Sequence, residues 1–387
     1  MGQISGVVHV FHKPLMYTCT GYWKRSIDIL VCLNDVGIDG YIVKNDRFER
    51  IDLKSLEIEK KLEPNNKFTL NYFFVSFVRF MLFFKHKNVQ LVHAFSNYEN
   101  ALPALLAAKV ANKPFIYEVR GFWHLTGLST NINYKNSINY RYTKRYEKLC
   151  YKHADFIVTL SHQMKGYIVE QGVAPSKIAI VPNAVNTNLF NPRNHLPYVR
   201  SADKPFTIGF IGTLTQYEGI SLLIESVKIL RKLRLIVNLV IIGTGPQEKE
   251  IKQLIKQIPY LQHIKKVPHN CVSKLYQGFD CCTYPRRNDP VCRYVPPLKV
   301  LEAMAMEKAV IVSDLPPLVE MVEDRVTGLV CVPDSPESLA EKIKLLMDDE
   351  ALARQLGQEA RRWVKANRTW EINAKKYMDV YEGKAAS

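Results

Sequence analysis

The chain has 387 residues, 47% hydrophobic and 23% charged, so it has a globular composition and is long enough for two hydrophobic cores. No run of 18 uncharged apolar residues occurs, which argues against a membrane-spanning helix, and the first residues lack the pattern of a secretory signal or a myristoylation site. The net charge of +16 divides into +10 for residues 1–190 and +6 for the remainder. This excess favours anionic partners such as nucleic acid, phosphorylated ligands or an anionic membrane; a generally Lys-rich surface is the alternative.

The eight cysteines contain no CxxC pair, and several of them, such as Cys32 and Cys331, lie in apolar runs. This usage is typical of small buried side chains in a reducing compartment. We therefore expect a cytoplasmic protein without a metal site.

Short β-rich runs alternate with helical patterns along the whole chain. The predicted strands are residues 6–11, 40–43, 91–95, 115–119, 156–160, 178–182, 206–212, 236–243, 281–285 and 309–313. The helical patterns include residues 99–111, 218–233 and 247–258, whose apolar positions recur every three or four residues. Continuous apolar strands separated by helices are typical of parallel sheets covered on both faces, so the predicted fold class is α/β.

Residues 186–205 interrupt this alternation, because they are rich in Asn and Pro and have no apolar periodicity. We predict two similar α/β domains, residues 1–190 and 206–360, with a linker at residues 191–205. A helical stretch within residues 361–387 is expected to pack back across the join.

Two segments of the first domain bear on membrane contact. Residues 68–87 (FTLNYFFVSFVRFMLFFKHK) carry aromatic side chains around most of a helix and are too short to span a bilayer. They predict either a core helix or an interfacial anchor. The basic helix at residues 139–153 favours an anionic surface nearby, so we expect possible attachment to the inner face of the cytoplasmic membrane.

Glycines mark two strand-to-helix turns in the second domain. In FIGTLTQYEGISLLIESV, Gly212 allows close backbone approach to a ligand, and Gly219 precedes a helix start that favours an anion. In IIGTGPQ, Gly243 and Gly245 are expected to shape the turn rather than to bind a ligand. A purely structural turn is the alternative at both places.

Basic residues gather in the segment PRRNDPVCRYVPPLKVLEAMAM. Arg286, Arg287 and Arg293 occupy one predicted strand-to-helix loop, and Lys299 follows in the first helical turn. Guanidinium groups at a helix start suit a diphosphate, since they form bidentate hydrogen bonds to its oxygens. A solvated basic loop is the alternative.

Glu302 is a single carboxylate in an otherwise apolar helical turn of the same segment. A buried carboxylate needs hydrogen-bond donors. A ribose diol would supply two of them, and a structural Lys or Arg is the competing explanation.

The order of these motifs resembles the retaining glycosyltransferases of family 4, which have the GT-B fold. The similar segments are GFIGTL with YEG, PLKVLEAMA and VIVSD in the second half, and VHAFSNYENALPALLAAKVANKPFIYEVRGFW and ADFIVTLS in the first. The resemblance spans roughly residues 6–345. It implies two Rossmann-like domains facing across a cleft, and a nucleotide-sugar donor used without a metal.

The resemblance also assigns roles to particular residues. Glu302 matches the second Glu of the family's E-x7-E motif, which holds the nucleotide ribose. Leu298 and Lys299 match the helix start that faces the donor phosphates. Gly21 matches the second glycine of the N-terminal glycine loop, and Gly212 matches the glycine that opens the phosphate loop.

The sequence departs from the family pattern at several of these places. The first Glu of E-x7-E is Tyr294 here, with Arg293 beside it. The usual basic pair of the phosphate loop falls on Thr213 and Glu218, and the histidine common after the fourth strand falls on Arg120.

We hypothesise that Arg286, Arg293 or Lys299 supplies the missing positive charge for the donor diphosphate. The predicted catalytic residues are therefore Arg286, Lys299 and His93, and Thr213 lies among the donor-binding residues. His93, at the end of a predicted strand, is expected with Arg120 on the acceptor side. A histidine that only caps its strand is the alternative.

The resemblance implies transfer of a sugar, with retention of configuration, from a nucleoside-diphosphate donor to a lipid-linked or growing-glycan acceptor of a surface polysaccharide. We expect a UDP-sugar rather than a GDP-sugar, no further cofactor and no nucleic-acid partner. No pair of carboxylates suggests double displacement as in hydrolases. A non-catalytic partner of another glycosyltransferase and a nucleotide-sugar epimerase are the alternatives.

Overall fold

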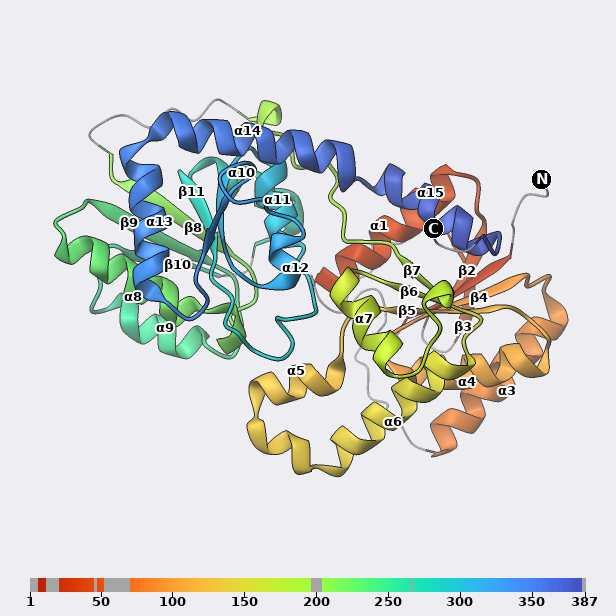
Figure 1. The fold of residues 1–387 in the computed structure, drawn as a ribbon. Coiled ribbons are helices and arrows are strands. Elements are labelled where there is room, and N and C mark those ends of the chain that lie inside the picture. Colours follow the sequence, from red (N-terminus) through yellow and green to blue (C-terminus); the bar gives the residue numbers. More distant parts are fainter. Residues whose placement is uncertain are drawn as a thin grey trace. The chain divides into compact units, whose positions relative to one another are not determined.

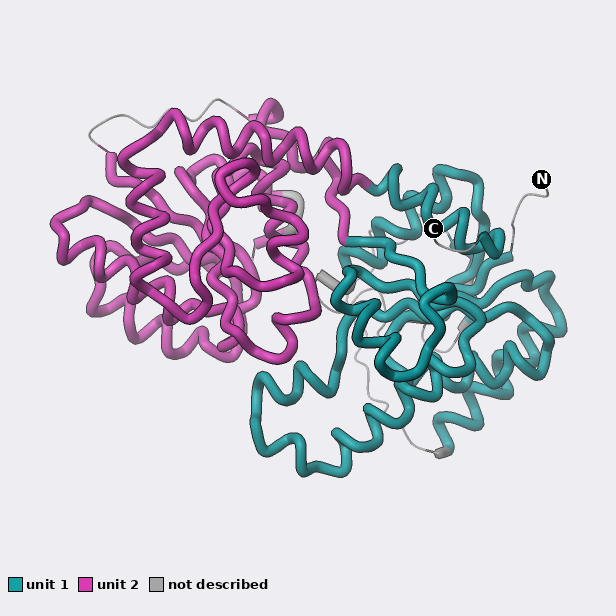
Figure 2. The backbone as a smooth tube through the Cα atoms, viewed as in Figure 1, with its two compact units in different colours: residues 1–182, 370–387 teal, residues 183–369 magenta. Residues whose placement is uncertain are grey.

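The computed structural model describes residues 6–11, 21–44, 47–51, 70–195, 204–265 and 267–384 (Figure 1). The chain forms two compact units, coloured separately in Figure 2. Unit 1 comprises Met1–Pro182 together with Trp370–Ser387, and unit 2 comprises Asn183–Thr369. Unit 2 is therefore continuous in sequence, whereas unit 1 includes a C-terminal segment that follows unit 2 in the sequence.

Unit 1 is built on a seven-stranded sheet in the order β3-β2-β1-β4-β5-β6-β7. Its strands are β1 (Val7–Val10), β2 (Gly40–Lys44), β3 (Arg47–Arg50), β4 (Leu91–Phe95), β5 (Phe115–Val119), β6 (Phe156–Thr159) and β7 (Ile178–Ile180). All neighbours pair in parallel except β3, which runs antiparallel to β2 at the edge. Every residue of β1, β4 and β5 is buried, as expected for strands covered on both faces.

Helices cover both faces of this sheet (Figure 1). They are α1 (Gly21–Asp35), α3 (Leu70–His86), α4 (Tyr98–Val110), α5 (Trp123–Thr130), α6 (Ile138–His153), α7 (His162–Glu170) and α15 (Trp370–Tyr381), with short 3-10 turns at Ile132–Asn136 and Pro175–Lys177. Helix α1 packs against α15, and α4 packs against both α3 and α6. Side-chain caps begin α4, α6 and α7, where Asn97, Ser137 and Ser161 accept hydrogen bonds from backbone N–H groups.

Unit 2 contains a six-stranded parallel sheet in the order β10-β9-β8-β11-β12-β13. Its strands are β8 (Phe206–Ile211), β9 (Val237–Ile242), β10 (Leu261–Ile264), β11 (Cys281–Tyr284), β12 (Ala309–Ser313) and β13 (Leu329–Cys331). The strand order reverses between β8 and β11. Ligands of open α/β sheets bind outside the carboxyl ends of the strands at such a point.

The helices of unit 2 are α8 (Ile220–Lys232), α9 (Glu248–Ile255), α10 (His269–Gln277), α11 (Lys299–Ala305), α12 (Pro316–Val319), α13 (Pro336–Asp348) and α14 (Glu350–Asn367), with 3-10 turns at Pro192–Asn194 and Gln216–Glu218. Helix α8 packs beside α13, and α11 packs beside α14. The sheet is thus enclosed by two helical layers, and the loops after β8 and β11 carry the polar residues singled out in the sequence.

These features confirm the predicted α/β fold class. The chain passes between units at Pro182 and Asn183, earlier than the boundary predicted at residue 190. The reason is that residues 183–190, the end of the predicted first domain, are bonded within unit 2: Asn183 donates to Pro296 O, Val185 N donates to Arg368 O, and Phe190 is fully buried. The predicted helical stretch at residues 361–387 is divided, since α14 belongs to unit 2 and α15 to unit 1.

The aromatic segment at residues 68–87 forms α3, whose first described residue is Leu70. Phe80 and Phe84 are buried, whereas Phe74, Val78 and Leu82 are about half exposed or more on the opposite side. The helix therefore contributes to the core and also presents an apolar stripe to solvent. Among the described residues, no helix combines the length and apolar character needed to cross a bilayer.

Candidate active site

Two glycines bring the ends of β8 and β9 close together in unit 2. Gly212 follows β8 and donates its N–H to Ile242 O over 2.9 Å. A Cβ atom on Gly243, which has φ 142°, would lie 1.9 Å from Gly212 O. A Cβ atom on Gly212 would lie 2.8 Å from Nζ of Lys299. Glycine at both positions therefore permits the close approach and leaves room for the lysine ammonium group.

The next turn also depends on glycine. Gly219 has φ 73° and directly precedes α8, and a Cβ there would lie 1.8 Å from Pro285 O. A Cβ on Gly245 would lie 2.5 Å from Leu214 O. These contacts give both residues a structural reason to be glycine. The contact at Gly219 packs the loop after β8 against the loop after β11, and the contact at Gly245 packs it against the loop after β9.

Glu218 joins these loops through two ion pairs. It lies in the 3-10 turn Gln216–Glu218 and is 5% exposed. Its Oε1 accepts a hydrogen bond from Nη2 of Arg286 over 2.8 Å, and its Oε2 accepts one from Nζ of Lys299 over 2.5 Å. Nη1 of Arg286 donates to Val295 O over 2.7 Å. Two of the three cations proposed for the diphosphate thus meet on one buried carboxylate.

The electrostatics of the cluster follow from this geometry. Burial would raise the pKa of Glu218, but the charges of Arg286 and Lys299 lower it to about 2. Burial would lower the pKa of Arg286, but Glu218 raises it above its ordinary value. Burial and the neighbouring Arg286 lower the pKa of Lys299, and Glu218 opposes that shift. With all three groups ionised, the cluster carries a net charge of +1.

Aromatic side chains surround the start of α11. Nζ of Lys299 lies 4.2 Å from the ring centroid of Phe210. The hydroxyl groups of Tyr276 and Tyr284 donate to Lys299 O over 3.3 and 3.1 Å, and Tyr276 also lies 3.5 Å from Oε2 of Glu302. Glu302 is half-buried one turn into α11. The structure therefore brings Gly212, Lys299 and Glu302 to one end of the sheet of unit 2.

The other predicted residues of unit 2 lie outside this cluster. Arg293 is exposed, and its Nε donates to Oδ1 of Asn288 over 2.8 Å. Thr213 is exposed beside Gly212, and Tyr294 and Leu298 are half-buried. The geometry thus separates Arg293 from Arg286 and Lys299, which the sequence could not do.

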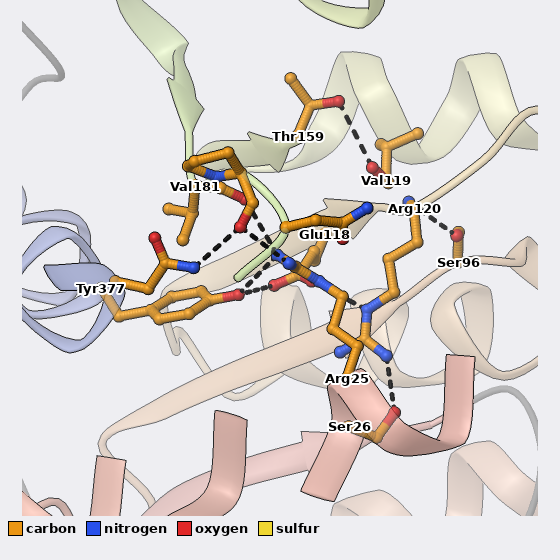
Figure 3. A network of polar contacts seen from close by, with 12 residues as sticks. Arg25, Ser26, Ser96, Glu118, Val119, Arg120, Thr159, Val181 and Tyr377 are labelled. Carbon is orange, nitrogen blue, oxygen red and sulfur yellow. Dashed lines mark hydrogen bonds and ion pairs between the residues drawn. The ribbon is translucent and has the colours of Figure 1, made fainter. Parts of the chain in front are cut away.

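A buried polar network occupies the carboxyl ends of the strands of unit 1 (Figure 3). Glu118 of β5 has no exposed surface, and Arg25, Arg120 and Tyr377 converge on it in the close-up. Nε of Arg25 and Nε of Arg120 donate to Oε1 over 3.1 and 2.8 Å, and the hydroxyl of Tyr377 donates to Oε2 over 2.7 Å. Burial would raise the pKa of Glu118, but Arg120 and Arg25 hold it well below its usual range.

His93 belongs to this network. It has no exposed surface; its Nδ1 lies 2.7 Å from the Tyr381 hydroxyl, and its Nε2 lies 3.4 Å from Oε2 of Glu118. Burial lowers the pKa of His93. Arg120 is also buried and stacks over Phe95 at 4.1 Å. Both predicted acceptor-side residues therefore have partners within unit 1.

Gly21 is the first residue of α1. Thr20, which precedes Gly21 in the predicted loop, lies outside the described residues.

Sequence reasoning missed Glu118, Arg25 and Tyr377. A signal existed for Glu118, because a carboxylate inside the apolar run FIYEV must find donors when the strand is buried. Arg25 lies on the buried face of α1, where it also donates to Val181 O and Pro182 O. No local pattern connects either residue with α15, more than 250 positions away.

The two α/β units, each built on a largely parallel sheet between helices, have the GT-B fold. Residues 195–363 match the family "Glycosyl transferases group 1", and residues 43–189 match "Glycosyltransferase Family 4". The chain belongs to these group 1 glycosyltransferases of family 4.

Similar proteins agree with this assignment. An uncharacterised glycosyltransferase of Methanocaldococcus jannaschii is 24% identical over 255 residues, which cover 64% of each chain. The capsular polysaccharide biosynthesis glycosyltransferase CapM of Staphylococcus aureus is 25% identical, with 75% of each chain covered. The structure of Anabaena HepE in complex with UDP-glucose superposes with a TM-score of 0.73 at 14% identity, covering 97% of this chain and 99% of that one. The match thus spans less than two thirds of the archaeal relative's length.

Proposed function

We propose that the protein transfers a sugar from a nucleoside-diphosphate donor to a lipid-linked or growing-glycan acceptor in the synthesis of a surface polysaccharide. The observation that carries the proposal is the position of the Lys299 ammonium group, which lies against Gly212 at the strand-order reversal of unit 2. Arg286 lies beside it on the same carboxylate. A donor diphosphate at this place would meet two cations and a backbone that it can approach closely.

The chemistry proposed for these groups is charge stabilisation. Negative charge grows on the nucleoside diphosphate as the bond to the sugar breaks, and fixed cations in a partly buried site stabilise that charge. Lys299 and Arg286 have this role in the proposal, with no metal or other cofactor, and Glu302 binds the ribose. The acceptor hydroxyl reacts on the face from which the diphosphate departs, and the departing diphosphate takes up the hydroxyl proton, so the anomeric configuration is retained.

The donor is proposed to be a UDP-sugar. HepE, whose fold is similar, was crystallised with UDP-glucose. The polysaccharide acceptor is proposed from the resemblance to CapM, a capsular polysaccharide glycosyltransferase.

The experiment begins with thermal-shift measurements on UDP, GDP, ADP, CMP and dTDP and their sugars, because a ligand of the native state raises apparent stability. Stabilisation by UDP and UDP-sugars is expected. Release of UDP only when an acceptor is present would support transfer, and NMR of the product gives its anomeric configuration. An isomerised donor without acceptor would instead show an epimerase, and no nucleotide binding would indicate a non-catalytic partner protein.

Metal dependence is measured separately. Unchanged turnover in EDTA is expected, because Lys299 and Arg286 carry the charge stabilisation in the proposal. Loss of turnover that Mg²⁺ restores would contradict the role given to these two residues.

We also propose that one surface of unit 1 faces a membrane, which would suit a lipid-linked acceptor. The stripe on α3 is made of Phe74, Val75, Val78 and Leu82, spaced so that they share one side of the helix. On α6, which packs on α4 as α3 does, the exposed basic residues are Arg141, Lys144, Arg145, Lys148 and Lys152. The single acidic residue of α6, Glu147, is buried. Apolar and basic side chains together suit an anionic lipid surface at the inner face of the cytoplasmic membrane.

Vesicle co-sedimentation tests this attachment. Binding to vesicles with anionic lipid at low salt, release at high salt and no binding to neutral phosphatidylcholine vesicles are expected. Replacing both Phe74 and Leu82 by Ser should weaken binding without lowering stability, since both side chains are 55% exposed. Equal binding to neutral and anionic vesicles, or none at low salt, would contradict the proposal.

A further inference from the structure

Glu218 stands at a position of the phosphate loop where an acidic side chain is unexpected. The family pattern has a basic residue at this position, and a carboxylate near the donor phosphates would repel them. Yet Glu218 is almost fully buried and forms ion pairs with both Arg286 and Lys299. Its presence therefore has to be explained together with those two cations.

The carboxylate of Glu218 accepts hydrogen bonds from both cations. Oε1 and Oε2 of Glu218 form a bidentate pair with Nη2 and Nε of Arg286, at 2.8 and 3.2 Å. Oε2 also accepts from Lys299 Nζ over 2.5 Å. Arg286 is itself fixed by Val295 O, and Ser313 Oγ donates to Arg286 O over 2.7 Å. Arg286 thus anchors Glu218, and Glu218 holds the flexible lysine side chain on one side.

Aromatic rings and the backbone of Gly212 also lie close to the Lys299 ammonium group. Its Nζ lies over Phe210 and 5.5 Å from the ring centroid of Tyr284, and Gly212 leaves no Cβ in its way. Other titratable groups near this ammonium group are Arg286 and Cys292. The ammonium group is therefore confined beside the carboxyl end of β8.

We propose that Glu218 is a positioning residue: it holds the Lys299 ammonium group charged and directed at the donor diphosphate. The inference rests on the proposed function. Relative to the family pattern, the loop carries an acid at position 218, and its cationic partner Lys299 stands at the start of α11. The cluster retains one net positive charge, because Arg286 and Lys299 together carry two positive charges and Glu218 carries one negative charge.

Glu218→Gln tests the role because it keeps the shape and removes the charge. Burial and Arg286 already lower the pKa of Lys299, and Glu218 opposes this, so the variant should lose the lysine proton at lower pH. The alkaline limb of the kcat/KM profile for donor should move down by about one pH unit, with a tenfold loss on that limb. UDP binding, measured by calorimetry, should weaken in parallel, and Glu218→Asp should recover part of both.

A charge exchange provides the second arm. Glu218→Lys alone places three cations together, and Lys299→Glu alone places two acids beside one arginine. The double variant restores the balance with a cation at the family position. We expect it to bind UDP at least tenfold more tightly than either single variant.

The matched control is Glu225→Gln on α8, whose partner Lys228 lies 3.1 Å away on the surface. It should leave the pH profile and UDP binding unchanged. If Glu218→Gln also left both unchanged, or if the double variant bound no better than the singles, the inference would be overturned while the proposed function stood. Absence of nucleotide binding by the wild type would remove the proposed function first, and the inference with it.

Discussion

The hydroxyl group of Tyr377 donates to Oε2 of Glu118 over 2.7 Å, which ties α15 to β5 across 259 positions of sequence. Glu118 also receives hydrogen bonds from Arg25 and Arg120, so its buried charge is well compensated. Arg25 in turn donates to the Val181 and Pro182 carbonyl groups, the last residues before the chain enters unit 2.

Tyr377→Phe is expected to destabilise the protein by about 1–3 kcal/mol, because it removes one donor from a buried carboxylate. Urea unfolding followed by circular dichroism measures the change. Tyr142→Phe, an equivalent change on the exposed side of α6, should cost less than about 0.5 kcal/mol. Equal effects of the two substitutions would show that the hydrogen bond does not stabilise unit 1.

Lys299→Ala should weaken donor binding about 10- to 100-fold, since a charge-assisted hydrogen bond to phosphate contributes roughly 1.5–3 kcal/mol. Arg286→Ala should reduce donor affinity as well as stability, because it leaves Glu218 buried with one cation fewer. Calorimetric titration with UDP gives the affinities. Arg293→Ala is the control: its side chain is exposed and bonded to Asn288, so we expect a change of less than threefold.

Glu147 predicts a pH dependence of stability. Burial raises its pKa to about 7, although Tyr117 and the Tyr98 N–H donate to it. The folded state therefore binds this proton more tightly than the unfolded state, whose carboxyl group titrates near pH 4.3. The resulting stabilisation, on the order of 3 kcal/mol, is present below that pH and is lost as pH rises to about 7.

Glu147→Gln should abolish this contribution to the pH dependence. Relative to the wild type, the variant should become progressively more stable between about pH 5 and pH 8 in urea unfolding. Glu170→Gln, at an exposed position on α7, should follow the wild-type curve. A constant difference between Glu147→Gln and the wild type at all pH values would refute the prediction.

Gly243→Ala should disturb the site through the backbone of Gly212, without changing a charged group. The new Cβ would lie 1.9 Å from Gly212 O and would require a φ that favours glycine, so the end of β8 must shift. We expect a loss of roughly 2 kcal/mol or more in stability, together with weaker UDP binding. Gly166→Ala in α7 meets no neighbouring atom and should be neutral or slightly stabilising.

The sequence was sufficient for the α/β class because β1, β4, β5 and β12 are mostly apolar runs that alternate with helical patterns. It did not reveal β3, a charged antiparallel strand at the edge of its sheet, β10, an edge strand of the other sheet, or β13, which has three residues. Edge strands and very short strands lack the apolar run on which such predictions depend.

The sequence predicted which cations belong to the candidate site, but it did not predict which side chains contact one another there. Charges at strand ends pointed to Arg286 and Lys299, but their shared partner Glu218 lies 81 positions before Lys299. Glu218 appeared only as a departure from the family pattern. A long-range ion pair depends on how the loops after β8 and β11 meet, which no local pattern encodes.

The divided sequence of unit 1 has a consequence for synthesis of the protein. Residues 1–182 leave the ribosome first, yet their sheet lacks the Tyr377 hydroxyl and the rest of α15 until all of unit 2 has been translated. Unit 2, being continuous, has its whole sequence available earlier. During elongation, Arg25 and Glu118 therefore lack their hydrogen-bond partner Tyr377 until more than 180 further residues have been synthesised. The sequence of unit 1 is thus complete only after that of unit 2.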